Sequence, residues 1–138
     1  MMTVKELLGL DKLKSIELAA GKAGAKRAVT GAVMLDNPEM VDWMREGELL
    51  LTTGYVLKEN PDLQDDILDA LIKNKASGLA IKTRRYFDEI PCSITDKAEK
   101  LTFPILRLPY YMSLSEISEI INRHVYLDGF ENNYEAQA

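Results

Sequence analysis

The stretch Gly47-Glu48-Leu49-Leu50-Leu51-Thr52-Thr53-Gly54-Tyr55 decides how this chain of 138 residues is expected to fold. Its three consecutive leucines are typical of a strand that is covered on both faces, as strands of a parallel sheet are. The change to Thr-Thr-Gly indicates that the strand ends there in a polar loop. Because open α/β sheets bind ligands at such strand ends, the stretch predicts both a central strand and one edge of a site.

Helical and strand patterns alternate around this stretch. Thr3-Val4-Lys5-Glu6 is a capping box, Asn37 and Asn60 each precede a proline at a predicted helix start, and Ser113 opens a second capping box. A stripe of apolar residues makes the helix after Asn60 the clearest one. The expected strands cover residues 15–20, 29–35, 48–53, 79–81 and 103–109, and the expected helices cover residues 3–9, 38–46, 61–76, 91–101 and 114–129.

The order of these elements predicts the fold class. From residue 48 onward strands and helices alternate, which implies right-handed crossovers and an α/β fold with a mostly parallel or mixed central sheet flanked by helices. The two earlier strands are joined by a polar loop around residues 21–24 and are expected to pair antiparallel beside it. We expect a single domain over residues 1–129, followed by a flexible polar tail over residues 130–138.

The composition excludes several classes of protein. The net charge of -5 argues against a stand-alone nucleic-acid binder, which would need Lys and Arg to neutralise phosphates. No apolar run approaches the roughly 20 residues that a membrane helix requires, and the N-terminus lacks the apolar core of a secretory signal. The single cysteine, Cys92, cannot form an internal disulfide, which favours a reducing compartment. A cytoplasmic protein without membrane contact is therefore expected.

The polar ends of two strands form the candidate ligand site. Successive parallel strands point the same way, so the segment after residue 52, the segment after residue 81 and Pro109-Tyr110-Tyr111 should share one edge. Hydroxyls, a flexible glycine, cations and aromatic rings suit a small anionic or planar ligand, although ordinary loop and cap chemistry would place the same residue types there. The predicted ligand-binding residues are Thr52, Thr53, Gly54, Tyr55, Lys82, Thr83, Arg84, Arg85 and Tyr86.

The chain shows no pattern of catalytic, metal or cofactor residues. His124 is the single histidine and is expected beside the core face of the last helix, while Cys92 has no histidine near it in sequence. There is no Walker A loop, dinucleotide fingerprint, zinc spacing or EF-hand loop. We therefore expect no enzyme activity and no cofactor. Trp43 with Met40 and Met44 is expected to be core, the alternative being a surface that faces a partner.

Four segments in order carry a family resemblance: Thr3 to Leu8, Gly47 to Tyr55, Gly78-Leu79-Ala80-Ile81-Lys82, and Phe103 to Pro109. Together they resemble the N-terminal domain of purine-catabolism-regulator-like (PucR-like) bacterial transcription regulators, over residues 2 to about 127. The resemblance implies a regulatory domain, usually followed by a C-terminal helix-turn-helix that binds DNA. These 138 residues contain no candidate recognition helix, so DNA contact is expected only through a module outside this chain.

The first hypothesis is a non-enzymatic domain that senses a small effector, from the purine pathway or another anion, and passes a signal through the last helix. A homodimer is expected. The alternative is a dimerisation or protein-interaction module, acting through Trp43 or the last helix and binding no small molecule. A third hypothesis, a hydrolase or transferase with Thr52 or Thr53 as nucleophile, lacks an activating base.

Overall fold

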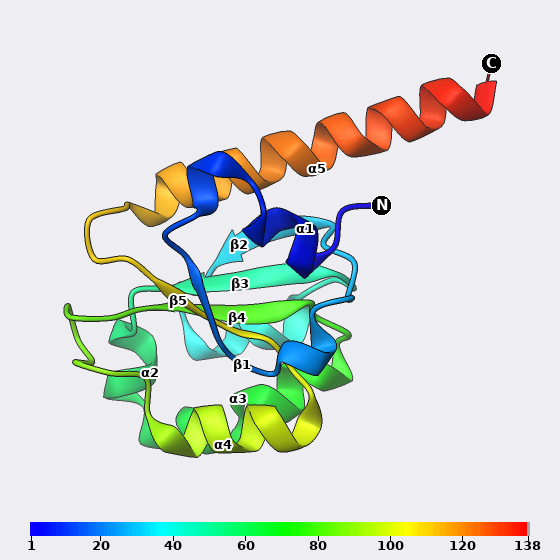
Figure 1. The fold of residues 1–138 in the computed structure, drawn as a ribbon. Helices are drawn as coiled ribbons and strands as arrows, with labels where there is room; N and C mark the ends of the chain where they lie inside the picture. Colours follow the sequence, from blue (N-terminus) through cyan, green and yellow to red (C-terminus); the bar gives the residue numbers. More distant parts are fainter. Residues whose placement is uncertain (138) are drawn as a thin grey trace.

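The protein is built on one five-stranded mixed sheet, which confirms the α/β prediction (Figure 1). In the computed structural model, which describes the backbone of residues 1–137 and the side chains of residues 1–129, the strand order is β1-β5-β4-β3-β2. Strands β2 to β5 run parallel, and β1 pairs antiparallel with β5. The strands are β1 Glu17–Ala20, β2 Gly31–Met34, β3 Glu48–Thr52, β4 Gly78–Lys82 and β5 Ile105–Leu108.

The leucine run of β3 lies where the sequence predicts it, inside the sheet. Leu49, Leu50 and Leu51 are all buried, and so is every residue of the neighbouring strand β4. Both faces of these strands are covered by helices, so side chains of either parity leave water. Alternate residues therefore contribute to two separate cores, one on each face of the sheet.

The first two strands do not pair with each other, which corrects the prediction for this region. They lie at opposite edges of the sheet, β1 antiparallel to β5 and β2 parallel to β3. The connection between them contains the short 3-10 helix η2, Lys22–Gly24, which packs against residues 102–104. A connection of this length passes around the sheet, whereas a hairpin would need a tight turn.

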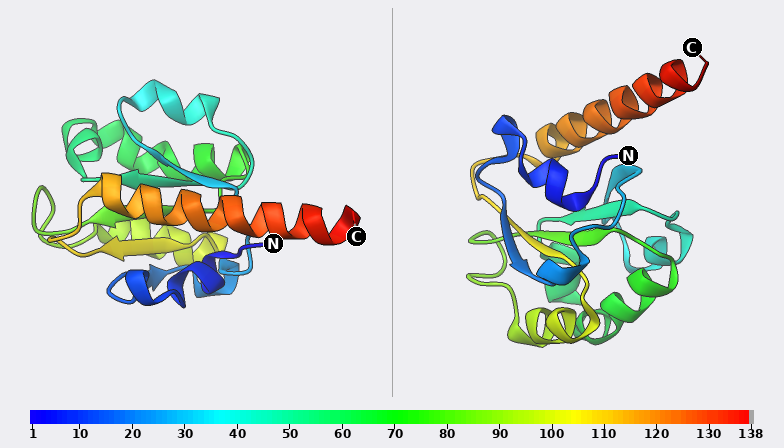
Figure 2. Two further views of the ribbon diagram at one scale, coloured as in Figure 1. Left: turned by 90° about the horizontal axis from the view of Figure 1, so that it is seen from above. Right: turned by 45° about the vertical axis from the view of Figure 1, so that its right-hand side comes forward.

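Helices cover both faces of the sheet, as Figure 2 shows from two further directions. One core lies under the 3-10 helix η3 (Pro38–Trp43) and the helices α2 (Tyr55–Glu59), α3 (Pro61–Lys73) and α4 (Cys92–Leu101). The other lies under α1 (Val4–Leu8), the 3-10 helix η1 (Asp11–Leu13) and α5 (Leu114–Gln137). Within the described residues, none of the helices is long and apolar enough to cross a membrane.

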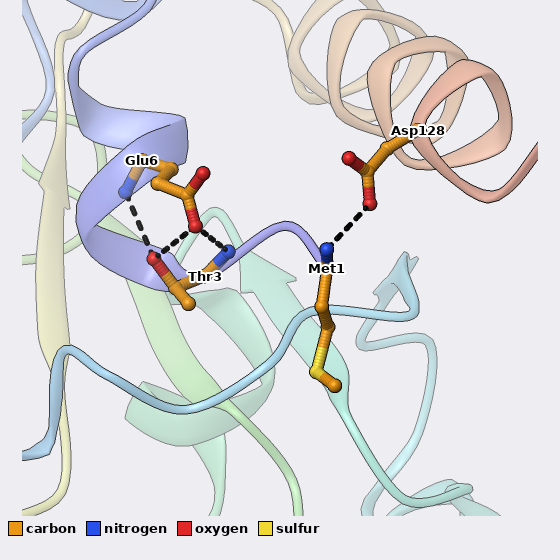
Figure 3. A network of polar contacts seen from close by, with 4 residues as sticks. All are labelled: Met1, Thr3, Glu6 and Asp128. Carbon is orange, nitrogen blue, oxygen red and sulfur yellow. Dashed lines mark hydrogen bonds and ion pairs between the residues drawn. The ribbon is translucent and has the colours of Figure 1, made fainter. Parts of the chain in front are cut away.

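Of the four predicted helix caps three are present and one is not. The hydroxyl of Ser113 accepts a hydrogen bond from Glu116 N at 3.1 Å at the start of α5, and α3 begins at Pro61 as predicted but without a side-chain cap. Thr3 Oγ1 accepts a hydrogen bond from Glu6 N at 3.2 Å and the Glu6 carboxylate accepts from Thr3 N at 3.2 Å, so the capping box is confirmed (Figure 3). Asn37 caps η3. Asn60 does not cap α3, because α2 ends immediately before it and the Asn60 amide donates to the carbonyl of Val56 at 2.7 Å.

The segment after Asn37 forms a shorter element than predicted. The helix is of the 3-10 type and ends at Trp43, and the next residue, Met44, has an extended backbone, so the predicted helix over residues 38–46 is too long. Val41 and Met44 are buried, whereas Trp43 is 82% exposed and does not belong to the core. In a 3-10 helix residues three apart lie on one face, so Val41 and Met44 turn inward together and Trp43 cannot join them.

Helix α5 is longer than predicted and is bound to an edge strand. It continues to Gln137, past Gly129 where the sequence suggested an end; the flexibility of residues 130–138 stays a prediction. The side chain of Asn122 accepts from Ala32 N at 2.8 Å and donates to Ala32 O at 3.3 Å. Because these backbone groups lie at the outer edge of β2, Asn122 protects an edge that another strand could otherwise use.

Candidate ligand site at the carboxyl edge of the sheet

The polar segments lie together where the parallel strands have their carboxyl ends, at the left of Figure 1. We call this side of the sheet the carboxyl edge. Thr52 of β3 is in register with Ile81 of β4, and Lys82 is in register with Leu108 of β5. The three parallel strands therefore end together, and the loops that follow them share this edge. The structure brings the predicted residues to the same edge but gives them different surroundings.

The residues after β3 shape a turn. Thr52 is 1% exposed and its hydroxyl accepts a hydrogen bond from Gly54 N at 3.0 Å, while the hydroxyl of Thr53 accepts from Tyr55 N at 3.3 Å. Gly54 has φ 99°, in the left-handed region, and a Cβ there would lie 3.0 Å from the ring of Phe87. The hydroxyls thus hold the start of α2, and the glycine allows the two loops to approach each other.

The aromatic and cationic groups after β4 contact one another. The rings of Tyr55 and Tyr86 lie 5.2 Å apart at 60°, and the guanidinium carbon of Arg85 lies 5.6 Å from the centre of the Tyr86 ring. Lys58 Nζ donates to the carbonyl oxygen of Tyr86 at 2.8 Å. These contacts join α2 to the loop after β4. The rings of Tyr55 and Tyr86 are thus already in contact with other side chains of the protein.

A hollow of about 420 Å³ opens beside these loops, between the carboxyl ends of β4 and β5 and the start of the antiparallel strand β1. Of the nine predicted residues only Thr83 and Arg84 line it. Tyr110 and Tyr111, from the connection between β5 and α5, are 59% and 74% exposed. The lining residues are Ser15, Glu17, Thr83, Arg84, Arg107, Leu108, Pro109, Tyr110 and Tyr111.

Two charged residues of this hollow were missed by the sequence analysis. Arg107 Nη1 donates to Glu17 Oε2 at 2.8 Å, and the two residues are register partners across the antiparallel pair β1 and β5. Arg107 is the one charged residue of β5. A charged residue within an apolar strand predicts that its side chain extends out of the core, so the sequence did contain a signal for Arg107. The role of Glu17 depends on the pairing of β1 with β5, which the sequence did not reveal.

Arg84 has an unusual backbone conformation at the rim of the hollow. Its φ is 76°, and its N–H donates to the carbonyl of Phe87 at 2.7 Å, closing the loop after β4. A non-glycine residue in the left-handed region costs free energy and is found preferentially where function requires it. The guanidinium of Arg84 is exposed and shares the hollow with that of Arg107.

Lys82 is the charged residue of this edge that lies deepest in the protein. Only 5% of it is exposed, although it is the last residue of β4. Burial lowers the pKa of the Lys82 ammonium, and the nearby positive charge of Arg85 lowers it further. Both effects oppose the charged form, so the folded protein holds this cation at a cost in stability.

This cost gives a prediction on pH. Since the pKa of Lys82 is lower in the folded protein than its ordinary value of 10.5, the unfolded chain binds more protons between those two values, and stability rises with pH there. Lys82→Met removes the titration, so we expect its stability advantage over the wild type to be greatest near pH 7 and to shrink towards about pH 10. Urea unfolding of both proteins over this range measures the difference. Parallel pH profiles would contradict the prediction.

A second hollow, of about 520 Å³, lies at the opposite edge of the sheet and contains none of the predicted residues. The one arginine of this hollow, Arg27, is already engaged: Nη1 donates to the carbonyl of Thr102 at 2.9 Å, and the guanidinium lies 5.5 Å from the ring centre of Phe103. A guanidinium used in this way supports the fold. Arg107 at the carboxyl edge is engaged as well, by Glu17, but that edge adds the exposed Arg84 and two exposed tyrosines, which makes it the better candidate.

The metal-ligating residue types do not cluster in the part of the chain that the structure describes. Within those residues there is no cluster of three or more His, Cys, Asp or Glu side chains that could hold a metal ion. Cys92 is exposed at the start of α4, and His124 is half-buried on α5. The hollow offers guanidinium groups, which can pair with anions, tyrosine rings, which can stack, and hydroxyls, which can form hydrogen bonds.

Comparison with known proteins agrees with the resemblance seen in the sequence. The model of the purine catabolism regulatory protein-like family matches residues 6–125. The purine catabolism regulatory protein of Bacillus subtilis (strain 168) is 35% identical over 124 residues, which are 90% of this chain and 23% of that protein. The chain thus spans less than a quarter of the length of this relative, and no solved structure matches it. On these matches, the chain belongs to the purine catabolism regulatory protein-like family.

Proposed function

We propose that this chain is the effector-sensing domain of a bacterial transcription regulator and binds a small molecule without transforming it. One observation carries the proposal: the guanidinium of Arg84, that of Arg107 with its partner Glu17, and two tyrosines line a single hollow at the carboxyl ends of the parallel strands. This combination suits a planar or anionic metabolite. The name of the B. subtilis relative supports the purine pathway as the source of the effector.

The hollow is next to the helix that would carry the signal. Its wall includes Pro109, Tyr110 and Tyr111, and α5 begins three residues later at Leu114. An effector that contacts the two tyrosines more favourably in one position of this connection would shift α5 towards that position. Since α5 runs across the sheet and projects beyond it (Figure 2), such a shift would be felt outside the domain.

DNA would be contacted by a helix-turn-helix module that is not in this chain. The net charge of -5 supports a separate DNA-binding module, because this domain itself would repel the phosphate backbone of DNA. We propose a homodimer acting in the cytoplasm, where such a regulator meets DNA. Trp43, 82% exposed and close in sequence to the edge strand β2, supplies apolar surface for a contact between two copies.

The test is a thermal-unfolding screen with purine bases, urate and small carboxylates. An effector at a hundred times its Kd should stabilise the domain by about 2.7 kcal/mol. Arg84→Ala and Arg107→Ala should each weaken the binding at least about tenfold, because each removes a charge-assisted contact. Arg45→Ala is the matched control, since Arg45 is an exposed arginine outside the hollow, and its affinity should equal that of the wild type.

The alternative function, a dimerisation module without a ligand, makes the opposite prediction. Its stability would depend on protein concentration and would not respond to any compound of the screen. Exposed Trp43 and Met34 are the observation that favours it, the latter being 40% exposed on β2. A flat ligand screen together with a dimer that Trp43→Ser disrupts would replace the sensing function by this alternative.

A further inference from the structure

The ammonium group of Lys82 lacks a counter-ion in the described part of the chain. No hydrogen bond or ion pair to it occurs among residues 1–129, although the residue is only 5% exposed. Burial lowers the pKa of the ammonium, and the charge of Arg85, which has the same sign, acts on it and lowers that pKa further. Lysines that are this little exposed are usually paired, whereas the ammonium of Lys82 has contact with water in place of a protein partner.

The pleat of β4 shows which face of the sheet Lys82 occupies. Leu79 and Ile81 belong to the core under α2, α3 and α4, whereas Ala80 belongs to the core under α5. Side chains alternate along a strand, so Lys82 lies on the α5 face. Its register partner Leu108 also belongs to the core under α5, as does Met112 from the connection that leads into this helix.

Lys82 is also within reach of solvent. Among the described residues, Ser77 Oγ is the one completely buried side-chain oxygen or nitrogen without a partner, so Lys82 Nζ, which has none either, retains contact with water. A small anion can therefore reach the ammonium, and the apolar surroundings would strengthen the attraction between them.

Lys82 does not itself line the hollow, but its chain neighbour Thr83 and its register partner Leu108 do. We infer that Lys82 is the receptor for a negatively charged group of an effector that extends from the hollow past these two residues, an oxyanion such as a carboxylate or phosphate. Binding would supply a counter-ion on the α5 face, next to Leu108, the last residue of β5 before the connection into α5. The unliganded domain holds a cation at a cost in stability, and the oxyanion removes that cost. This inference rests on the proposed sensing function and assigns its specificity to one residue.

The experiment compares thermal unfolding of the wild type and Lys82→Met in inorganic phosphate and in acetate, with sodium chloride at matched ionic strength as the reference. Methionine keeps the length of the side chain without the charge. We expect Lys82→Met to melt higher than the wild type in chloride and to lose the additional stabilisation that phosphate or acetate gives the wild type. A shift with phosphate alone or with acetate alone identifies the preferred oxyanion.

Lys100→Met is the matched control, because Lys100 is exposed at the end of α4 and should leave the response to both anions unchanged. Two results would overturn the inference. In the first, Lys82→Met melts at a lower temperature than the wild type and is still stabilised by the anions. In the second, phosphate and acetate stabilise the wild type no more than chloride does. Arg84→Ala with Arg107→Ala tests the proposed function separately: if this pair loses effector binding while Lys82→Met keeps it, the sensing function stands and the role of Lys82 is rejected.

Discussion

Leu50→Ala will lower the free energy of unfolding by about 2–5 kcal/mol, the range for truncating a fully buried leucine. Leu50 is 0% exposed, lies in the middle of β3, and belongs to the core under α2, α3 and α4. The sheet holds it from both sides, so its surroundings cannot collapse to fill the cavity. Urea unfolding followed by circular dichroism measures the change.

Leu101→Ala provides the comparison for Leu50. Leu101 is 39% exposed at the end of α4, so the same truncation should cost less than about 1 kcal/mol. Equal losses for the two variants would mean that β3 is not the centre of the core. A loss at Leu50 together with an unchanged slope against urea would show that the alanine variant reaches the same folded state.

Gly21→Ala will destabilise the protein by at least about 2 kcal/mol, although it adds a single methyl group. Gly21 has φ 72°, where an alanine is strained, and its Cβ would lie 1.9 Å from the carbonyl oxygen of Phe103. Backbone must therefore move, and with it the hydrogen bond of 2.6 Å that Gly21 N donates to the carboxylate of Glu99. Chemical denaturation at equilibrium measures the loss.

Gly9→Ala is the control for this prediction. Gly9 has φ -83°, and a Cβ there would come no closer than 3.4 Å to the carbonyl oxygen of Glu6. We expect a change within about 0.5 kcal/mol, as for a substitution without strain. If Gly21→Ala were equally mild, the connection between β1 and β2 would not be packed against residues 102–104 as the structure describes.

The alternating part of the fold was predictable because its signals are local. Leu49 to Leu51 predict a strand covered on both faces, and the apolar stripe from Leu63 to Ile72 predicts a helix. Neither prediction needs information from other parts of the chain. The capping box at Thr3 needs only residues three apart. Asn60 shows the limit of this reasoning, because α2 ends at the same residue and the Asn60 side chain donates a hydrogen bond to the carbonyl of Val56 in α2 and does not cap α3.

The sequence predicted where the candidate site lies better than it predicted which residues line it. Parallel strands joined by helices must end at one edge, so Thr52, Lys82 and the loop after β5 were expected together. The pairing of Glu17 with Arg107 was not predictable, since 90 residues separate them and β1 gives no sign of choosing β5 as its neighbour. Nor did the sequence reveal that the ring of Tyr86 would contact that of Tyr55.

The sequence by itself determined that this is an α/β domain with a buried central strand and a polar carboxyl edge, because hydrophobic periodicity and helix caps act over a few residues. Only the tertiary structure decided that Arg84 and Arg107 share a hollow, that Asn122 closes the edge of β2, and that Lys82 is buried without a counter-ion. These features arise where segments distant in sequence pack together, and strand order and burial are set there by the whole sheet.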